Sequence, residues 1–175
     1  MKLILLTLTL FFGSAAIAGN ESLPERLLTP SNGEFIVPNV EYFNGSKLIS
    51  INEEKTKFIL LNFWATWCPA CVAEMSSLDS LAMLENKKNL KVIAVNVNEG
   101  GPSEVKPFLS KFKFKKMSIL YDSTNKSSKD FAIRGLPTTF LISPKGKILA
   151  KIEGSTNWNS SNIRSQIEKY IDMNQ

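Results

Sequence analysis

The chain has 175 residues, of which 43% are hydrophobic and 21% are charged, and its formal net charge at pH 7 is +5. These values are typical of a globular protein, and the modest, scattered positive charge gives no evidence for nucleic-acid binding. The chain has two cysteines and no histidine. This count excludes a histidine general base, a Ser-His-Asp triad and any metal site with a histidine ligand.

The first 18 residues have the pattern of an export signal. A basic start at Met1–Lys2 precedes the apolar run Leu3–Phe12, and Ala16-Ile17-Ala18 has the small-x-small form of a signal-peptidase site. The run is shorter than the roughly 20 residues of an ordinary membrane-spanning helix. We therefore predict that residues 1–18 are a signal peptide, cleaved after its last residue. The alternative is an uncleaved anchor in the inner membrane, in which residues 14–18 lengthen the apolar segment.

Residues 19–32 are polar and mixed, and we interpret them as a tether between the signal and a single domain over residues 33–175. A domain of this size can bury a sizeable hydrophobic core. It begins with two apolar-rich segments, 35–42 and 47–51. They are joined across Asn44-Gly45, which is a strong signal for a β-hairpin.

The rest of the domain alternates strand-like and helix-like segments. Phe58–Phe63 is a continuous apolar run typical of a strand buried on both faces, and an amphipathic helix is predicted from about Pro69 to Asn86. The other predicted strands are Leu90–Val97, Met117–Tyr121, Thr138–Ile142 and Lys147–Ile152, and the other predicted helices are Ser103–Phe112, Ser127–Ile133 and Ser160–Ile171. This order predicts an α/β sandwich with a central mixed sheet flanked by helices.

The motif that carries chemistry is Cys68-Pro69-Ala70-Cys71, which follows a predicted buried strand and opens a predicted helix. Proline is well tolerated at the first helical position, so Cys68 should lie at the helix N-terminus. Unpaired amides and the helix dipole stabilise an anion there, which favours a nucleophilic thiolate near neutral pH. Cys71, one turn deeper, can attack a mixed disulfide at Cys68 and release the product. The pair therefore predicts dithiol–disulfide exchange.

Three other interpretations of the two cysteines have less support. A structural disulfide between them closes a very small loop and constrains the unfolded chain little. Half of a zinc site would lack the further cysteine or histidine ligands that four-coordinate zinc needs. A chance pair of buried thiols is the third alternative, and the position between a strand and a helix argues against it.

Two segments resemble a known family. Residues 62–71 (NFWATWCPAC), followed by Glu74, resemble the active-site segment of bacterial extracytoplasmic thioredoxin-like proteins of the TlpA/ResA/CcmG-like group. Gly135-Leu136-Pro137-Thr138 resembles the loop of the thioredoxin fold that carries a cis-proline. The resemblance covers about residues 33–173 and implies a thioredoxin-like fold. The extra residues at about 101–122 resemble the α–β insertion of this group.

The resemblance also implies roles for residues beyond the cysteine pair. Pro137 should be in cis, where it shapes the substrate groove and discourages metal capture by the thiols. Leu136 should offer its backbone N–H and C=O to an extended substrate segment, in the manner of an added strand. Trp67 should flank Cys68 on the docking surface. The alternatives are an ordinary turn proline and a leucine that only fills the core.

Glu74 lies three residues after Cys71, so the two share one face of the predicted helix. In the group that the chain resembles, the matching glutamate can be partly buried beneath the cysteines, where it tunes proton transfer to the second thiol. Asn62 stands where cytoplasmic-type thioredoxins have a buried aspartate, which makes Glu74 the better candidate for handling protons. The alternative is a solvated glutamate in the first turns of the helix, favoured there by the dipole.

We therefore expect an exported thiol–disulfide oxidoreductase of the periplasm that reduces protein disulfides through Cys68 and Cys71. The redox-active disulfide would act without a further cofactor or a metal. The resemblance implies a membrane electron donor of the DsbD/CcdA type and a role in cytochrome c maturation. Two alternatives stay open. One is a dithiol oxidase or disulfide isomerase that uses the same residues, and the other is a non-enzymatic binding or chaperone module on the same fold.

Overall fold

The computed structural model describes residues 23–53, 57–83, 89–112 and 114–175. These residues form an eight-stranded mixed sheet in the order β1-β8-β7-β4-β5-β6-β2-β3. The strands are β1 (Thr29–Pro30), β2 (Glu41–Phe43), β3 (Leu48–Ser50), β4 (Phe58–Trp64), β5 (Leu90–Asn96), β6 (Ser118–Tyr121), β7 (Thr138–Ile142) and β8 (Ile148–Glu153). The helical elements are η1 (Ile51–Glu53), α1 (Pro69–Ala82), α3 (Gly101–Leu109), α4 (Lys126–Asp130) and α5 (Ser161–Met173).

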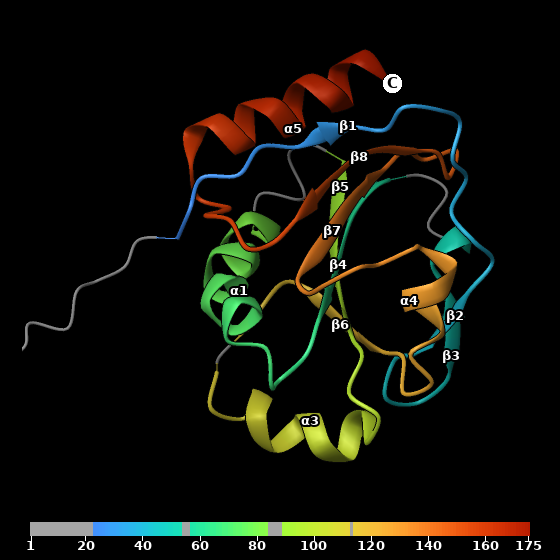
Figure 1. The fold of residues 1–175 in the computed structure, drawn as a ribbon, viewed down its shortest axis with the longest axis vertical. Helices are drawn as coiled ribbons and strands as arrows, with labels where there is room; N and C mark the ends of the chain where they lie inside the picture. Colours follow the sequence, from blue (N-terminus) through green and yellow to red (C-terminus); the bar gives the residue numbers. More distant parts are fainter. Residues whose placement is uncertain (1–22, 54–56, 84–88, 113) are drawn as a thin grey trace, which may run out of the picture.

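The central strand of the sheet is β4, which pairs in parallel with β5 and antiparallel with β7. All seven of its residues are buried. Figure 1 shows α1 and α4 on opposite sides of the central strands, so an almost wholly apolar strand is stable here because both of its faces are covered. The end of β4 is therefore a rigid support for the loop that follows it.

The element predictions from the sequence are largely confirmed, including the mixed sheet, the thioredoxin-like fold and the hairpin at Asn44-Gly45, which joins β2 and β3. Helices α3 and α4 differ most from their predicted bounds. Helix α3 begins at Gly101, two residues earlier than predicted, and contains Pro107. Helix α4 stops at Asp130 because Ala132 has a left-handed backbone (φ 49°) that an α-helix cannot continue. The predicted end of the first long helix, near Asn86, lies outside the described residues.

Residues 23–32, which the sequence analysis assigns to a tether, pack against the domain. Strand β1 pairs antiparallel with β8. The backbone of Leu28 donates a hydrogen bond to the side chain of Gln166 on α5 (2.6 Å) and accepts one from it (2.9 Å). The Leu28 side chain belongs to the core, so this stretch is part of the folded unit. The predicted signal peptide lies outside the described residues.

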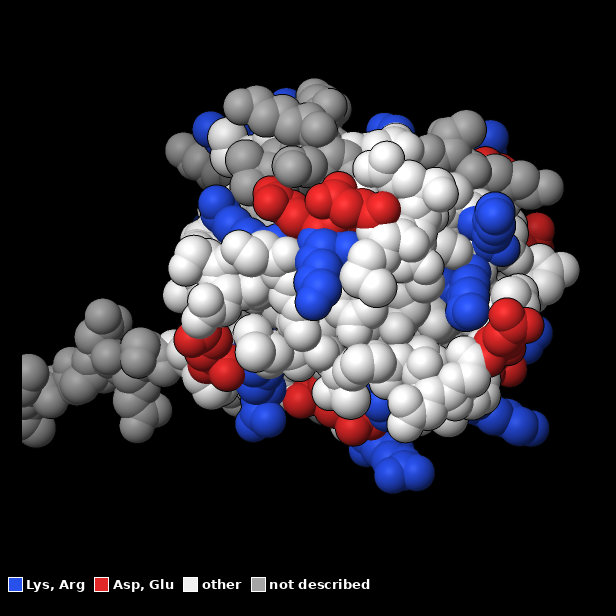
Figure 2. Space-filling view, turned by 90° about the horizontal axis from the view of Figure 1, so that it is seen from above, with Lys and Arg blue, Asp and Glu red and all other residues white. Residues whose placement is uncertain are grey.

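The surface carries charges of both signs. Figure 2 shows basic and acidic side chains interspersed over the face that it presents. Two exposed ion pairs join Lys151 to Glu153 (3.0 Å) and Lys147 to Glu34 (3.4 Å), and such pairs add little stability. In the part of the chain that the structure describes, no helix is both long and apolar enough to cross a membrane.

Candidate active site

The two cysteines lie where β4 gives way to α1. Cys68 is the N-cap residue of α1, Pro69 is its first residue, and the backbone N–H of Cys71 donates to Cys68 Sγ (3.2 Å). The two sulfur atoms form a disulfide, with the Cα atoms 5.3 Å apart. The buried strand fixes the start of this turn. Proline fits the first helical turn because backbone N–H groups there have no partner within the helix, so the absence of one costs nothing.

The two sulfur-bearing residues differ in their access to solvent. Cys68 is 6% exposed, whereas Cys71 is 0% exposed. Of the two, only Cys68 has any exposed surface, and the backbone amide and the helix dipole at this position favour a thiolate on it. Cys71 is placed to react only with a group already attached to Cys68. This asymmetry is the one that the sequence motif predicted.

A groove of about 390 Å³ is lined in part by Trp67, the residue before Cys68 in the chain. Trp67 and Leu136 both line it, and Trp67 is 66% exposed. The peptide bond between Leu136 and Pro137 is cis, as the resemblance implied, and the carbonyl of Pro137 accepts a hydrogen bond from Gly154 N (2.8 Å). The fold thus brings two residues that are far apart in the sequence, and that were both predicted to contact substrate, to one groove.

Glu74 is fully buried in the core on α1. Its Oε1 accepts a hydrogen bond from Asn62 Nδ2 (2.9 Å), and its Oε2 accepts two, from Thr156 N (3.0 Å) and from Trp158 Nε1 (3.1 Å). Burial raises the pKa of Glu74 to about 7, and the hydrogen bonds from Thr156, Asn62 and Trp158 oppose this rise without cancelling it. Glu74 can therefore gain or lose a proton near neutral pH.

Two of the three groups that bind Glu74 were missed by the sequence analysis. Thr156 and Trp158 lie in the connection between β8 and α5, more than 80 residues from Glu74. No motif marks them, because a donor to a buried carboxylate can be any backbone amide or any indole. Only the packing of this connection against α1 shows their role.

A second network holds the loop before Cys68. The side chain of Asn98, which is buried after β5, accepts from Thr66 N (3.0 Å) and donates to Thr66 Oγ1 (2.7 Å). Asn98 Nδ2 also donates to Glu104 on α3, whose other carboxylate oxygen accepts from Gly100 N (3.1 Å). The loop that carries Trp67 is thereby fixed to the first turn of α3. This contact, too, was not foreseen from the sequence.

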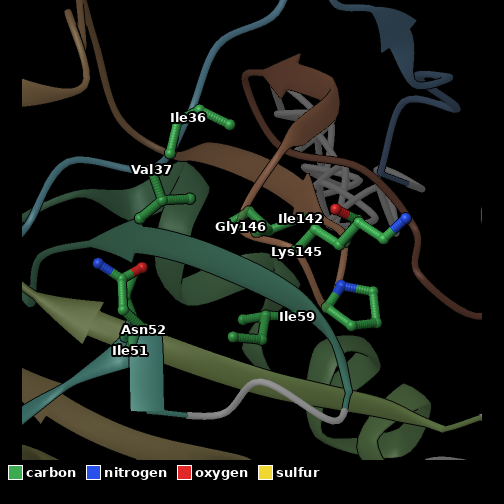
Figure 3. A pocket seen from close by; sticks show the side chains of 10 residues that line it. Ile36, Val37, Ile51, Asn52, Ile59, Ile142, Lys145 and Gly146 are labelled. Atoms are coloured by element: carbon green, nitrogen blue, oxygen red, sulfur yellow. The ribbon is translucent and has the colours of Figure 1, made fainter.

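Another cavity, of about 350 Å³, lies at the opposite end of the central strands (Figure 3). Ile59, near the start of β4, and Ile142, at the end of β7, are among the residues that line it. Most of its lining side chains are apolar, and Asn52 and Lys145 are the main polar ones. None of its lining residues is a cysteine or an acid, so the redox chemistry of this chain belongs to the Cys68 end. Among the described residues, no group of three or more potential ligands could hold a metal ion.

Comparison with known proteins agrees with this geometry. A family model described as Redoxin matches residues 32–167. The chain belongs to the Redoxin family. The thiol-disulfide oxidoreductase ResA of Bacillus subtilis (strain 168) is 30% identical to it over 160 residues, which cover 91% of this chain and 81% of that protein. ResA of Bacillus cereus (strain ATCC 10987 / NRS 248) is 29% identical over 170 residues, which cover 97% and 91%.

Solved structures show the same fold. A candidate thiol:disulfide interchange protein DsbE from Chlorobium tepidum has a TM-score of 0.71 at 20% identity, covering 79% of this chain and 96% of that one. StoA from Bacillus subtilis has a TM-score of 0.59 at 24% identity, covering 81% and 98%. This Redoxin-family chain is thus a thioredoxin-like protein of the TlpA/ResA/CcmG-like group. With its Cys68–Cys71 disulfide, it is a thiol–disulfide oxidoreductase.

Proposed function

We propose that the protein is a reductase of disulfides in other proteins. The observation that carries this proposal is the asymmetric pair at the N-terminus of α1, with Cys68 6% exposed and Cys71 fully buried. A reductase needs one thiol that a folded partner can reach and a second that reacts only after the partner is attached.

The reaction has two exchange steps. The Cys68 thiolate attacks one sulfur of the partner disulfide, so an intermolecular S–S bond forms and the other partner sulfur leaves as a thiolate. The Cys71 thiolate then attacks Cys68 Sγ, which forms the Cys68–Cys71 disulfide and releases the second partner sulfur as a thiolate. Two electrons pass to the partner, which takes up two protons. The oxidised pair must then receive two electrons from an upstream dithiol.

Glu74 is proposed to take the proton that Cys71 must lose before the second step. It follows Cys71 by three residues on α1, so the two side chains share one helix face in the core. A carboxylate whose pKa is about 7 can accept a proton and return it near neutral pH. Trp67 and the backbone of Leu136 are proposed to bind the partner segment along the groove that they line, with the cis peptide bond between Leu136 and Pro137 fixing the direction of the chain there.

The setting of the reaction is proposed from the sequence and the relatives together. The signal-like N-terminus supports a periplasmic location with a cleaved signal. Resemblance to the TlpA/ResA/CcmG-like group supports a membrane electron donor of the DsbD/CcdA type and a disulfide substrate from cytochrome c maturation. The Cys68–Cys71 disulfide would be the redox group of the enzyme, with no further cofactor.

The test of this proposal is the reduction potential of the Cys68–Cys71 pair, measured by equilibration in defined thiol–disulfide buffers. A value near that of thioredoxin, about −270 mV, is expected for a reductase. A value near about −120 mV would make the protein a dithiol oxidase instead. The Cys71→Ser variant is the matched control: it should trap the partner on Cys68 as a stable mixed disulfide, whereas Cys68→Ser should trap none.

A further inference from the structure

The two ends of the Asn62 side-chain amide differ in their hydrogen bonding. Its Nδ2 donates to Glu74 Oε1 (2.9 Å) and to Thr139 Oγ1 (2.9 Å), and Thr139 lies directly opposite it in the β4–β7 pair. Its Oδ1 is buried and has no hydrogen-bond partner among the described residues. A buried amide oxygen left without a donor is costly and uncommon, so its presence beside the titrating carboxylate of Glu74 calls for a physical reason.

The two oxygens of Glu74 are not equivalent as proton sites. Oε2 accepts from Thr156 N and from Trp158 Nε1, and a backbone amide and an indole are donors only. A proton on Oε2 would point toward two N–H groups, so the proton of neutral Glu74 must lie on Oε1. There it faces Asn62 Nδ2, which is also a donor. With the amide in this orientation, the O–H of a neutral Glu74 and the Nδ2–H of Asn62 would be two donors that face each other without an acceptor between them.

We infer that Asn62 turns its side-chain amide by about half a revolution each time Glu74 takes up or releases its proton. After the turn, Oδ1 occupies the place of Nδ2 and accepts from Glu74 Oε1–H and from the Thr139 hydroxyl, which can donate as well as accept. Asn62 makes two hydrogen bonds in either state, and the end of the amide that points away from Glu74 lacks a partner among the described residues in both. The orphaned oxygen is thus the acceptor held ready for the protonated state. The two ends of the amide are similar in size, so the turn needs no repacking of the core.

Asn62 is therefore a positioning residue for the proton step, and the inference rests on the proposed role of Glu74. An aspartate at this place would add a second negative charge beside Glu74, and an aliphatic side chain would satisfy neither state. An amide side chain can place either a donor or an acceptor at the same position, because a half-turn exchanges its nitrogen and its oxygen. It lets a carboxyl group exchange a proton inside a dry core with the same number of hydrogen bonds before and after.

The groups that face Glu74 come from four elements. Asn62 faces it from β4, Thr156 and Trp158 from the connection after β8, and Cys71 lies one turn away on α1, while Thr139 on β7 acts through Asn62. In the described part of the chain, burial raises the pKa of Glu74 and the three hydrogen bonds lower it. The cysteines titrate only when reduced. The test is therefore made on the oxidised protein, in which Glu74 is the titrating group of this set.

The direct test is NMR of the oxidised protein, labelled with ¹⁵N, above and below the pKa of Glu74. At the higher pH, the Asn62 Nδ2 protons should show a strong nuclear Overhauser effect to the Thr139 side chain. At the lower pH, the effect should weaken several-fold because Oδ1 has taken that place. An effect of equal strength at both pH values would overturn the inference while leaving a titrating Glu74, and with it the proposed proton role of Glu74, intact. If Glu74 does not titrate between about pH 5 and 9, the inference and the proposed role of Glu74 both fail, whereas the reductase proposal is decided separately by the reduction potential of the cysteine pair.

A pair of variants gives a second readout that a purely structural role would not move. Trp158→Phe removes a donor that favours the ionised carboxylate, so the pKa of Glu74 should rise by about one unit. Asn62→Leu removes one hydrogen bond from each protonation state, so the pKa should move by clearly less than in Trp158→Phe. An equal or larger rise in Asn62→Leu would mean that Asn62 is a fixed donor, and would overturn the inference. The measurement on the unmodified protein decides the question if either variant fails to fold.

Discussion

At Glu74 the desolvation of a carboxylate outweighs three hydrogen bonds, and the pKa rises from 4.5 to about 7 on folding. Between these two values the folded chain holds a proton on Glu74 that the unfolded chain has lost. Stability from this group is therefore fully present below about pH 4.5 and is lost as the pH rises through 7. The sign is opposite to that of a salt-bridged carboxylate, because here the folded state favours the neutral form.

Glu74→Gln should remove this pH dependence. The amide oxygen of glutamine can accept the two hydrogen bonds now made to Oε2, and the side chain carries no charge at any pH. We expect the loss of unfolding free energy between pH 5 and pH 8 to shrink by up to about 3 kcal/mol, as measured by urea unfolding of the oxidised protein. If Glu74 takes the proton of Cys71, the rate at which the protein reduces a partner disulfide should change with pH near neutrality. Glu74→Gln should remove that change. Glu41→Gln, at an exposed site, is the matched control, and an unchanged pH dependence in Glu74→Gln would contradict the assignment.

At the scale of elements, the parallel pairing of β4 with β5 determines where the active-site loop can be held. Trp64 and Asn96 are partners in that register, so the residues just beyond them, Thr66 and Asn98, meet at one edge of the sheet. The hydrogen bonds of Asn98 then tie the loop to Glu104 on α3. The inserted helix thus supports the wall of the groove that Trp67 provides.

Asn98→Ala should weaken both the fold and the reaction. It leaves the backbone amide of Thr66 without its acceptor, so we expect a loss of about 1–3 kcal/mol in unfolding free energy by urea titration. The kcat/KM for a protein disulfide should fall because the neighbouring Trp67 loses its support. Lys106→Ala, an exposed change on the same helix α3, should alter neither value. If Asn98→Ala behaves like Lys106→Ala, the network does not position the loop.

These contacts also show where prediction from the sequence ends. The position of Cys68 follows from local rules, since a buried apolar strand, a proline at the first helical position and a helix-forming segment each favour one local structure. The contact of Asn98 with Thr66 depends instead on strand register, and the contacts of Glu74 with Thr156 and Trp158 depend on how an irregular connection packs. Neither leaves a periodic pattern in the chain. Sequence reasoning could therefore name Glu74 but could not decide whether it was buried.

At the scale of the whole molecule, the N-terminal and C-terminal parts of the described chain stabilise one another. Residues that are polar on average were interpreted as a tether, yet they supply an edge strand, β1, to β8 and one core side chain. The composition of this stretch did not predict these contacts, because a single buried leucine among polar residues forms no periodic pattern. Leu27 and its neighbour Leu28 look alike in the sequence, and only the fold separates them.

This pair provides a sharp test of whether the N-terminal stretch belongs to the domain. Leu28 is 3% exposed and Leu27 is 50% exposed, so the same truncation should have unequal effects at adjacent positions. Leu28→Ala should lower the free energy of unfolding by about 2–4 kcal/mol, because it removes buried apolar surface and leaves a cavity between β1 and α5. Leu27→Ala should change it by less than about 1 kcal/mol. Urea unfolding of the two variants measures the difference. Equal, small effects would mean that residues 23–32 are a tether and do not belong to the folded domain.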